Sequence, residues 1–205
     1  MLLPVIGTAL LLGTALPAPA QEPFEVDGLV QGCTDGGERP GCIFYADGAR
    51  WIVDQDGATP AAVLAAFAAL PQNTPARFAG EILGMGDITV EVTLTAVDPT
   101  GLDPHADLRA GLQGDWVSVD DPLAAIRVDG SEWVNLYDGQ EMDQNLMTLG
   151  AQCADGIKTD GPAITLQMFG GTPEDQTCLA VMDISASALT LIHLPRGNML
   201  AYRRP

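Results

Sequence analysis

Apolar and polar residues alternate along most of this chain in short runs, and each run is bounded by turn residues. Within residues 88–97, three threonines and one glutamate alternate with isoleucine, valine, leucine and alanine. This period of two is typical of a half-buried β-strand. Asp47-Gly48 separates two such runs and is a strong hairpin signal. The pattern therefore predicts a mainly β protein with few helices.

The first half of the chain predicts five strands and one helix. Thr59 is an expected N-cap, Pro60 suits the first helical position, and Pro71 ends the helix that we predict over residues 61–70. The predicted strands cover residues 24–33, 41–46, 49–53, 77–83 and 88–97. Three strands, a helix and two strands is an element order that resembles the OB-fold, a small five-stranded barrel. The resemblance implies a small OB-like domain over residues 21–98, and we expect its barrel, like that of the second domain, to be antiparallel.

A boundary follows at residues 98–104, where two prolines and a glycine stand within seven residues. We therefore take residues 99–106 as a linker and residues 107–205 as a second domain. A short helix is expected over residues 105–112, and the rest of the domain reads as strands. The predicted strands cover residues 115–119, 124–128, 132–137, 146–153, 163–169, 177–184, 188–194 and 198–204. Their even spacing with tight turns predicts an up-and-down antiparallel barrel or a sandwich.

Two short motifs frame this second domain. Gly114-Asp115-Trp116 opens its first strand, and Tyr202-Arg203-Arg204 nearly ends the chain. The segment resembles a reduced member of the lipocalins and their calycin relatives, which begin their barrel with Gly-x-Trp. The resemblance implies that Arg204 (or Arg203) packs across the Trp116 indole by a cation–π contact and closes the barrel base. It also implies a small apolar ligand, although small barrels are generally filled by their own side chains.

The first twenty residues have the pattern of a secretory signal peptide. An apolar run is followed by Ala18-Pro19-Ala20, which places small residues at the −3 and −1 positions of a cleavage site. We therefore expect residues 1–20 to be removed and the protein to be periplasmic or extracellular in a bacterium. No later segment approaches membrane-spanning length, so no membrane insertion is expected.

Four cysteines, Cys33, Cys42, Cys153 and Cys178, are present. An even number in an exported chain predicts two disulfides, and three pairings are open. The local pairing, Cys33 with Cys42 and Cys153 with Cys178, keeps each bond inside one predicted domain. Without a Cys-x-x-Cys or histidine-rich spacing, neither a metal site nor a redox role is expected.

The chain has 27 acidic and 9 basic residues, a net charge of −18. This charge is divided equally between the two halves. Such a chain lacks the basic footprint that phosphate-backbone binding requires, so nucleic acid is not an expected partner. A solvated acidic surface is the simple interpretation, and faster encounter with a cationic partner is the functional one.

The sequence does not predict an active site. His105 in an acidic turn and His193 in an alternating run are the two available bases for a nucleophilic triad, and ordinary loop and strand roles explain both. Residues 54–57 form only a fragment of a calcium loop, because its later ligands are missing. We expect no catalytic residue, metal or cofactor.

Trp133 and Tyr137 lie on one face of their predicted strand by the period of two, so core packing is weighed against a role in lining a pocket. The sequence thus predicts a monomeric, non-enzymatic binding protein of the bacterial envelope. Its expected partner is a small apolar ligand or a basic protein. The alternatives are an acidic inhibitor of a cationic secreted enzyme such as a lysozyme, and, least favoured, a hydrolase.

Overall fold

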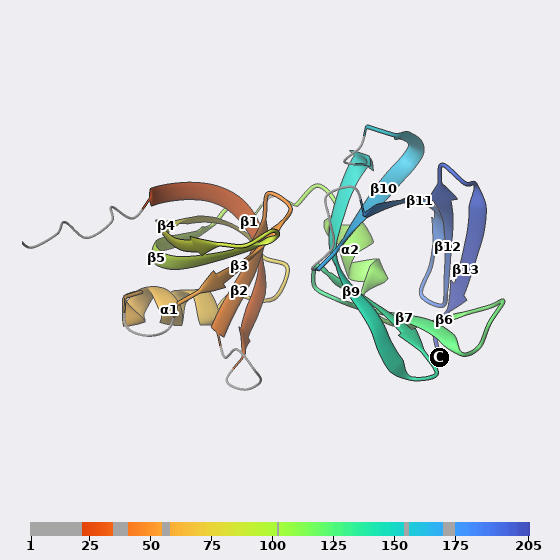
Figure 1. The fold of residues 1–205 in the computed structure, drawn as a ribbon, viewed down its shortest axis with the longest axis horizontal. Helices are drawn as coiled ribbons and strands as arrows, with labels where there is room; N and C mark the ends of the chain where they lie inside the picture. The colour runs from red at the N-terminus through yellow and green to blue at the C-terminus, as the bar shows by residue number, and fades with distance from the viewer. Residues whose placement is uncertain (1–21, 35–40, 55–57, 102, 154–155, 170–174) are drawn as a thin grey trace, which may run out of the picture.

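Two closed β-barrels lie side by side and are joined by a short linker (Figure 1). The computed structural model describes residues 22–34, 41–54, 58–101, 103–153, 156–169 and 175–205. The predicted fold class, mainly β with two small barrels, is confirmed. The expected signal segment, residues 1–20, lies outside the described residues, as do residues 55–57 of the rejected calcium loop. Among the described residues, no helix is long and apolar enough to cross a membrane.

The N-terminal barrel contains five strands in the order β1-β2-β3-β5-β4, with β4 returning to β1. Its elements are β1 (Glu22–Thr34), β2 (Gly41–Ala46), β3 (Ala49–Val53), α1 (Ala61–Ala68), β4 (Pro75–Met85) and β5 (Thr89–Pro99). We expected antiparallel pairing throughout, but β3 and β5 pair in parallel. The chain crosses the barrel through α1 and β4 between these two strands, and this crossover brings β5 back in the direction of β3.

Aromatic side chains fill the N-terminal barrel. Phe44 and Phe78 stack with ring centroids 3.8 Å apart, and Trp51 and Phe67 pack against them. All four side chains are buried. The Trp51 indole N–H donates to the backbone carbonyl of Ala46, so its polar group is satisfied inside the core.

The start of α1 differs from the prediction. Pro60, with extended backbone angles, is the N-cap itself, and the helix ends at Ala68. Thr59 is buried, and its hydroxyl accepts a hydrogen bond from the backbone N–H of Leu94 on β5. A tertiary contact therefore uses the side chain that local sequence assigned to the cap. The predicted turn at Asp47-Gly48 is confirmed, because both residues have the positive φ of a type I′ hairpin.

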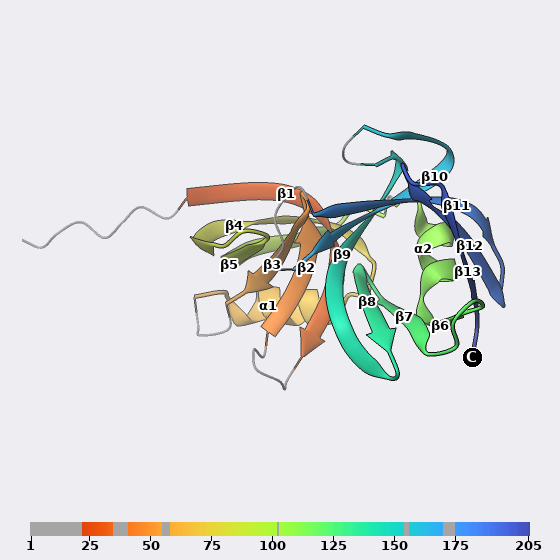
Figure 2. The ribbon, with the colours of Figure 1, turned by 45° about the vertical axis from the view of Figure 1, so that its right-hand side comes forward.

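The C-terminal barrel contains eight antiparallel strands, each paired with its neighbours in sequence, and β13 pairs with β6 to close it. Its elements are α2 (Ala106–Leu112), β6 (Gly114–Ser118), β7 (Ala124–Asp129), β8 (Glu132–Tyr137), β9 (Gln140–Gln152), β10 (Lys158–Met168), β11 (Gln176–Ile184), β12 (Ala188–Leu194) and β13 (Asn198–Arg203). The strand β9 begins at residue 140 and not at 146 as predicted, so residues 140–145 are part of the barrel. Figure 2 shows the same arrangement from a second direction.

One end of the C-terminal barrel is closed by α2 and Trp116. The indole is fully buried, and its N–H donates to the carbonyl of Leu112 at 2.8 Å. The Cζ atom of Arg204 lies 3.7 Å from the indole centroid, and its guanidinium also donates to the carbonyls of Gly111 and Gln113. A Cβ atom on Gly114, whose φ is +93°, would lie 2.8 Å from the Arg204 Nη1 atom. Glycine at this position therefore leaves the space that the arginine needs.

Candidate functional site

Polar contacts of Glu132 join the two barrels. This residue opens β8, and its carboxylate accepts hydrogen bonds from the Tyr45 hydroxyl, from the Arg50 guanidinium and from the side-chain amide of Gln144. Arg50 also lies 4.0 Å over the ring of Phe169 in the C-terminal barrel. Burial, followed by the nearby Glu132 charge, raises the pKa of Tyr45, so the hydroxyl stays protonated and donates. These contacts hold two walls of a cleft in place.

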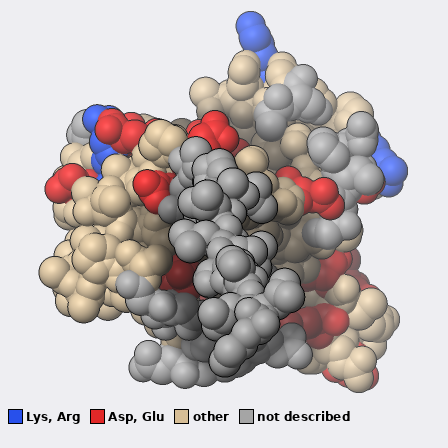
Figure 3. Space-filling view, turned by 60° about the vertical axis from the view of Figure 1, so that its left-hand side comes forward, with Lys and Arg blue, Asp and Glu red and all other residues tan. Residues whose placement is uncertain are grey.

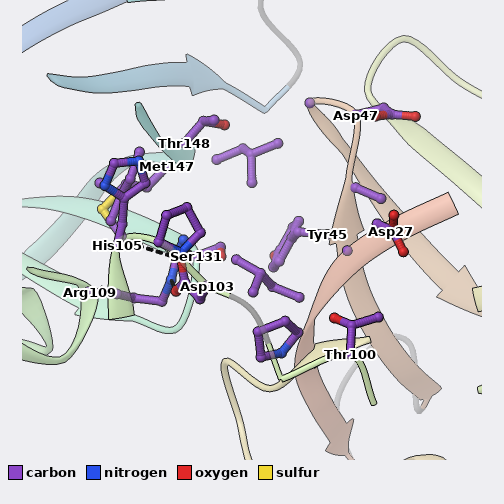
Figure 4. A pocket seen from close by; sticks show the side chains of 18 of the residues that line it. Asp27, Tyr45, Asp47, Thr100, Asp103, His105, Arg109, Ser131, Met147 and Thr148 are labelled. Carbon is purple, nitrogen blue, oxygen red and sulfur yellow. Dashed lines mark hydrogen bonds and ion pairs between the residues drawn. The ribbon is translucent and has the colours of Figure 1, made fainter. Parts of the chain in front are cut away.

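The cleft between the barrels has a volume of about 480 Å³ (Figure 4). Asp27, Tyr45 and Asp47 line the N-terminal wall, and Met147 and Thr148 of β9 line the wall across from them. The floor on the β9 side is apolar, because Leu146, Met147 and Leu149 are buried. A volume above roughly 300 Å³ is sufficient for a drug-sized ligand.

An ion pair lies at the base of this cleft. Arg109 of α2 donates from Nε to the Asp103 carboxylate at 2.9 Å, and the two side chains are 6% and 8% exposed. The same carboxylate accepts from the backbone N–H of His105. Burial alone would raise the pKa of Asp103, but these hydrogen bonds and the Arg109 charge outweigh it, so the pKa lies below its ordinary value.

The cleft also brings together Asp103, His105 and Ser131, the residue types of a hydrolytic triad. The hydrogen bonds do not form a relay. Asp103 bonds Arg109 and the backbone of His105, while the Ser131 hydroxyl accepts from Arg109. Within the part of the chain that the structure describes, no hydrogen bond joins the His105 imidazole to either side chain. The geometry therefore supports a structural role for these three residues.

A second, smaller cavity lies inside the C-terminal barrel and measures about 180 Å³. Its lining comes from six strands and from the exposed residue before β11. These residues are Trp133, Asn135, Asp143, Asn145, Leu166, Met168, Asp175, Thr177, Leu179, His193, Leu200 and Tyr202. The strand order places β12, which carries His193, across the barrel from β8 and β9. Met168, Asp175 and His193 lie where strands end away from α2, so the cavity opens at that end of the barrel.

Three polar side chains of this cavity form one network. Asn135 and Asn145 both donate from Nδ2 to the Oδ1 atom of Asp143, at 2.7 and 2.6 Å. The Trp133 indole N–H donates to the Oδ1 atom of Asn135 at 3.0 Å. Asn145 is buried, and Trp133 is almost completely so. The network fixes the orientation of a carboxylate inside a barrel, where polar groups are costly unless they are hydrogen-bonded.

Large exposed apolar side chains gather around the opening. Six of the nine such residues that the structure describes lie at the end of the barrel opposite α2. We call these six the apolar rim: Val119, Leu123, Tyr137, Met142, Met168 and Met199. Each is at least 38% exposed. A concentration of exposed apolar residues at one end of a monomer commonly marks an interaction surface.

The same end is strongly acidic. Its described segments are residues 119–123, 137–143, 175–177 and 193–199, and they contain six carboxylates and one arginine, Arg196. The carboxylates are Asp120, Asp121, Asp138, Glu141, Asp143 and Asp175. Figure 3 shows a different face of the molecule, on which acidic side chains lie at several places and basic ones lie near its edges. The open end thus combines apolar contacts with a local negative charge.

The predicted site residues take the following places. Cys33 pairs with Cys42 and Cys153 pairs with Cys178, which is the local connectivity. Trp133 lines the barrel cavity, whereas Tyr137, at the end of β8 beside the Asp138-Gly139 turn, lies on the rim. Of the two histidines, His105 lines the cleft and His193 lines the barrel cavity.

No family model, curated protein or solved structure matches this chain. The site must therefore be understood from its own chemistry. Among the described residues, no group of three or more histidine, cysteine, aspartate or glutamate side chains is arranged to hold a metal ion.

Sequence reasoning missed the polar network of the barrel cavity. The segment 140–145 is rich in polar residues, so it did not read as strand, yet it forms the first half of β9. One pattern in the sequence could have revealed this site: Asp143 and Asn145 are two residues apart, and the buried Met147 continues the same period of two. Two polar residues that continue the buried face of a strand indicate an interior polar site.

Proposed function

We propose that this protein is a non-catalytic binding protein of an oxidising, extracytoplasmic compartment, and that it recognises a basic protein with the open end of its C-terminal barrel. The observation that carries the proposal is the apolar rim, which surrounds a cavity containing a carboxylate. Two disulfides agree with an oxidising compartment. The periplasm or the medium, reached through a signal peptide over residues 1–20, is the location that we infer.

We also assign each barrel to a type. In the N-terminal barrel, the order β1-β2-β3-β5-β4 with a helix between β3 and β4 supports the OB type. The C-terminal barrel has eight next-neighbour strands, and Arg204 covers Trp116 at its closed end, which supports a calycin type. The first barrel lacks the basic face of nucleic-acid-binding OB domains and serves here as a rigid neighbour.

A basic protein explains the open end better than a small apolar ligand does. The barrel cavity, at about 180 Å³, is below the size that drug-sized ligands need, and half of its lining is polar. The net charge of −18 attracts a cationic partner over distances of about a Debye length, roughly 8 Å at physiological salt. The rim then supplies the apolar contact area.

A lysozyme is a suitable basic probe for this function. Binding should weaken and association should slow as the salt concentration rises from about 50 mM to about 500 mM. In the double variant Met142→Ser, Met199→Ser, two rim side chains that are 64% and 65% exposed are removed. We expect at least about tenfold weaker binding, measured by surface plasmon resonance.

The matched control is Met85→Ser, Met182→Ser, which removes two methionines, 73% and 59% exposed, that lie outside the rim. This control should bind the lysozyme as the unmodified protein does. Equal affinities for the two double variants, or no binding at low salt, would overturn the proposal.

A second candidate function, binding of a small apolar ligand, has one specific observation in its favour. The cleft between the barrels is large enough, at about 480 Å³, and its β9 floor is apolar. Native mass spectrometry of protein purified from its own compartment should then detect a small-molecule adduct. The adduct should be lost when the exposed Thr148 on the β9 wall is replaced by a charged residue, as in Thr148→Asp. A bare protein mass would eliminate this candidate.

A further inference from the structure

The cavity at the open end is lined as a binding site for one cationic side chain would be. We propose that it binds the alkylammonium group of a lysine that the basic partner presents, with Asp143 as the charged acceptor. This inference rests on the proposed function, because it names the group that the partner inserts through the apolar rim. The lysine site lies inside the cavity, whereas the rim is the surface around its opening. Experiments can therefore reject the lysine site and the rim contact independently.

Asp143 is a carboxylate inside a cavity without a cationic partner in the described structure. The ion pairs found among the described residues use other acids: Glu25, Asp27, Asp103, Asp115, Glu132 and Glu141. Asp143 is half-buried, so its charge is less well solvated than that of a surface aspartate. A ligand cation would restore the missing charge balance.

The carboxylate is also oriented in advance. Both amide donors, from Asn135 and Asn145, bond the Oδ1 atom. No donor among the described residues bonds the Oδ2 atom, which leaves that oxygen to accept from a ligand. Because Trp133 in turn holds Asn135, the acceptor needs little rearrangement on binding.

The cavity matches the size and polarity of a lysine side chain. At about 180 Å³ it has room for about six water molecules at roughly 30 Å³ each. Trp133, Leu200 and Tyr202 supply apolar and aromatic walls along which an aliphatic stem can lie. Burial raises the pKa of Tyr202, so this wall stays uncharged at neutral pH. Met168 and Met199 surround the entrance with adaptable apolar side chains.

Lysine suits the site better than arginine. A guanidinium binds a carboxylate best through two parallel hydrogen bonds that use both oxygens. In this cavity two amides already bond Oδ1, so Oδ2 remains for a single charged donor. An ammonium group is such a point donor, and its other N–H groups can turn toward the acceptors of Thr177 on β11 and His193 on β12, which line the same cavity.

The first experiment titrates the full-length protein with N-acetyl-lysine methylamide. The readout is the Trp133 indole N–H signal in a proton–nitrogen correlation spectrum, assigned with a Trp133→Phe variant. We expect a saturable shift of this signal and no shift of the Trp51 and Trp116 indoles, which lie in packed cores. The same compound acetylated on Nζ should bind at least about tenfold more weakly, and the arginine analogue several-fold more weakly.

Two charge-matched variants isolate Asp143. Asp143→Asn removes the charge from the cavity, and Asp138→Asn removes one charge from the adjacent turn, where asparagine tolerates the φ of 50°. We expect about tenfold or greater loss of lysine-analogue affinity in Asp143→Asn and less than about twofold in Asp138→Asn. Equal losses, or equal binding of the neutral analogue, would overturn the inference.

A third variant covers the case in which Asp143→Asn unfolds the barrel. Thr177→Met fills the cavity from β11, a strand that contributes no residue to the amide network, and it should abolish the Trp133 shift while circular dichroism stays unchanged. If the shift persists in Thr177→Met, the lysine analogue binds elsewhere and the inference is wrong.

Competition with a lysozyme tests whether the ammonium group comes from a protein lysine or from a free amine. A lysozyme should displace the lysine analogue, and the same lysozyme with acetylated lysines should not. If the analogue binds through Asp143 but the unmodified lysozyme cannot compete, the site serves a free amine and the protein source is wrong. If instead the rim variant binds the lysozyme normally while Asp143→Asn does not, the lysine site at Asp143 is supported and the assignment of the rim as a contact surface is wrong.

Discussion

The two barrels differ in what fills them. The five-stranded barrel is filled by stacked aromatic rings around Phe44 and Phe78, with other buried apolar side chains packed around them. The eight-stranded barrel is packed at one end, around Trp116 and Leu112, and hollow and polar at the other, around Asp143. One chain therefore contains a barrel with a filled interior and a barrel with a partly hollow, polar interior, which we propose is used for binding.

Strand number explains part of this difference. Barrel diameter grows with the number of strands, and eight strands give an interior that is either just filled by side chains or able to hold one small ligand. The chain uses both options, since α2 and Trp116 fill one end and leave the other open. Placing Asn135, Asp143 and Asn145 in the open half costs stability compared with apolar residues. That cost is what we expect of a region kept for recognition.

The two barrels should differ most in how much the free energy of unfolding falls when one interior side chain of each is truncated to alanine. Phe78 is fully buried and stacks on Phe44, so Phe78→Ala should lower the free energy of unfolding by about 3–5 kcal/mol. Leu200 lines the existing cavity and is only half-buried, so Leu200→Ala should cost about 1–2 kcal/mol. Urea denaturation measures both. Equal costs would show that the second barrel is as tightly packed as the first.

A smaller effect should come from the buried ion pair between Asp103 of the linker and Arg109 of α2. Asp103→Asn leaves the buried Arg109 guanidinium without its carboxylate and should cost about 3 kcal/mol at pH 7. Because the folded-state pKa of Asp103 is lowered, this stabilisation is present above the ordinary value of 3.8 and is lost as the pH falls through the lower folded value. The difference from the unmodified protein, measured by urea denaturation, should therefore shrink below about pH 4.

Asp107→Asn is the control for this variant, since Asp107 is an exposed acid on the same helix. It should change the free energy of unfolding by less than about 0.5 kcal/mol at any pH. A pH-independent cost in Asp103→Asn would contradict the assignment of the lowered pKa to the ion pair.

The smallest expected difference is in the stabilisation that the two disulfides contribute, one in each barrel. The Cys153–Cys178 bond closes a loop of 25 residues and the Cys33–Cys42 bond one of 9. Loop-closure entropy predicts stabilisation of about 3.5 and about 2.6 kcal/mol, a difference of about 1 kcal/mol. Replacing each pair with alanines and comparing urea midpoints tests this order. A larger loss from the Cys33/Cys42 pair would mean that contacts around that bond, and not loop length, decide its contribution.

How far sequence predicts this structure depends on whether local pattern and tertiary environment agree. The strand 88–97 and the Asp47-Gly48 hairpin follow local rules, and both are found within a few residues of the prediction. Thr59 has the local chemistry of a helix cap but bonds the backbone of a distant strand. The segment 140–145 does not alternate between apolar and polar residues, because Asp143 and Asn145 face the barrel cavity while Glu141 and Gln144 are also polar. The site was missed for the same reason, since interior polar residues are the exception to the rule that finds strands.

Hydrogen–deuterium exchange of the full-length protein, with and without a lysozyme, can show whether the two barrels divide stability and binding between them. On binding, we expect slower exchange in residues 119–123, 137–143 and 193–199, around the open end of the C-terminal barrel. Exchange in β1 to β5 and in the cleft between the barrels should not change. Protection confined to the N-terminal barrel or to the cleft would show that the open end of the C-terminal barrel is not the binding surface.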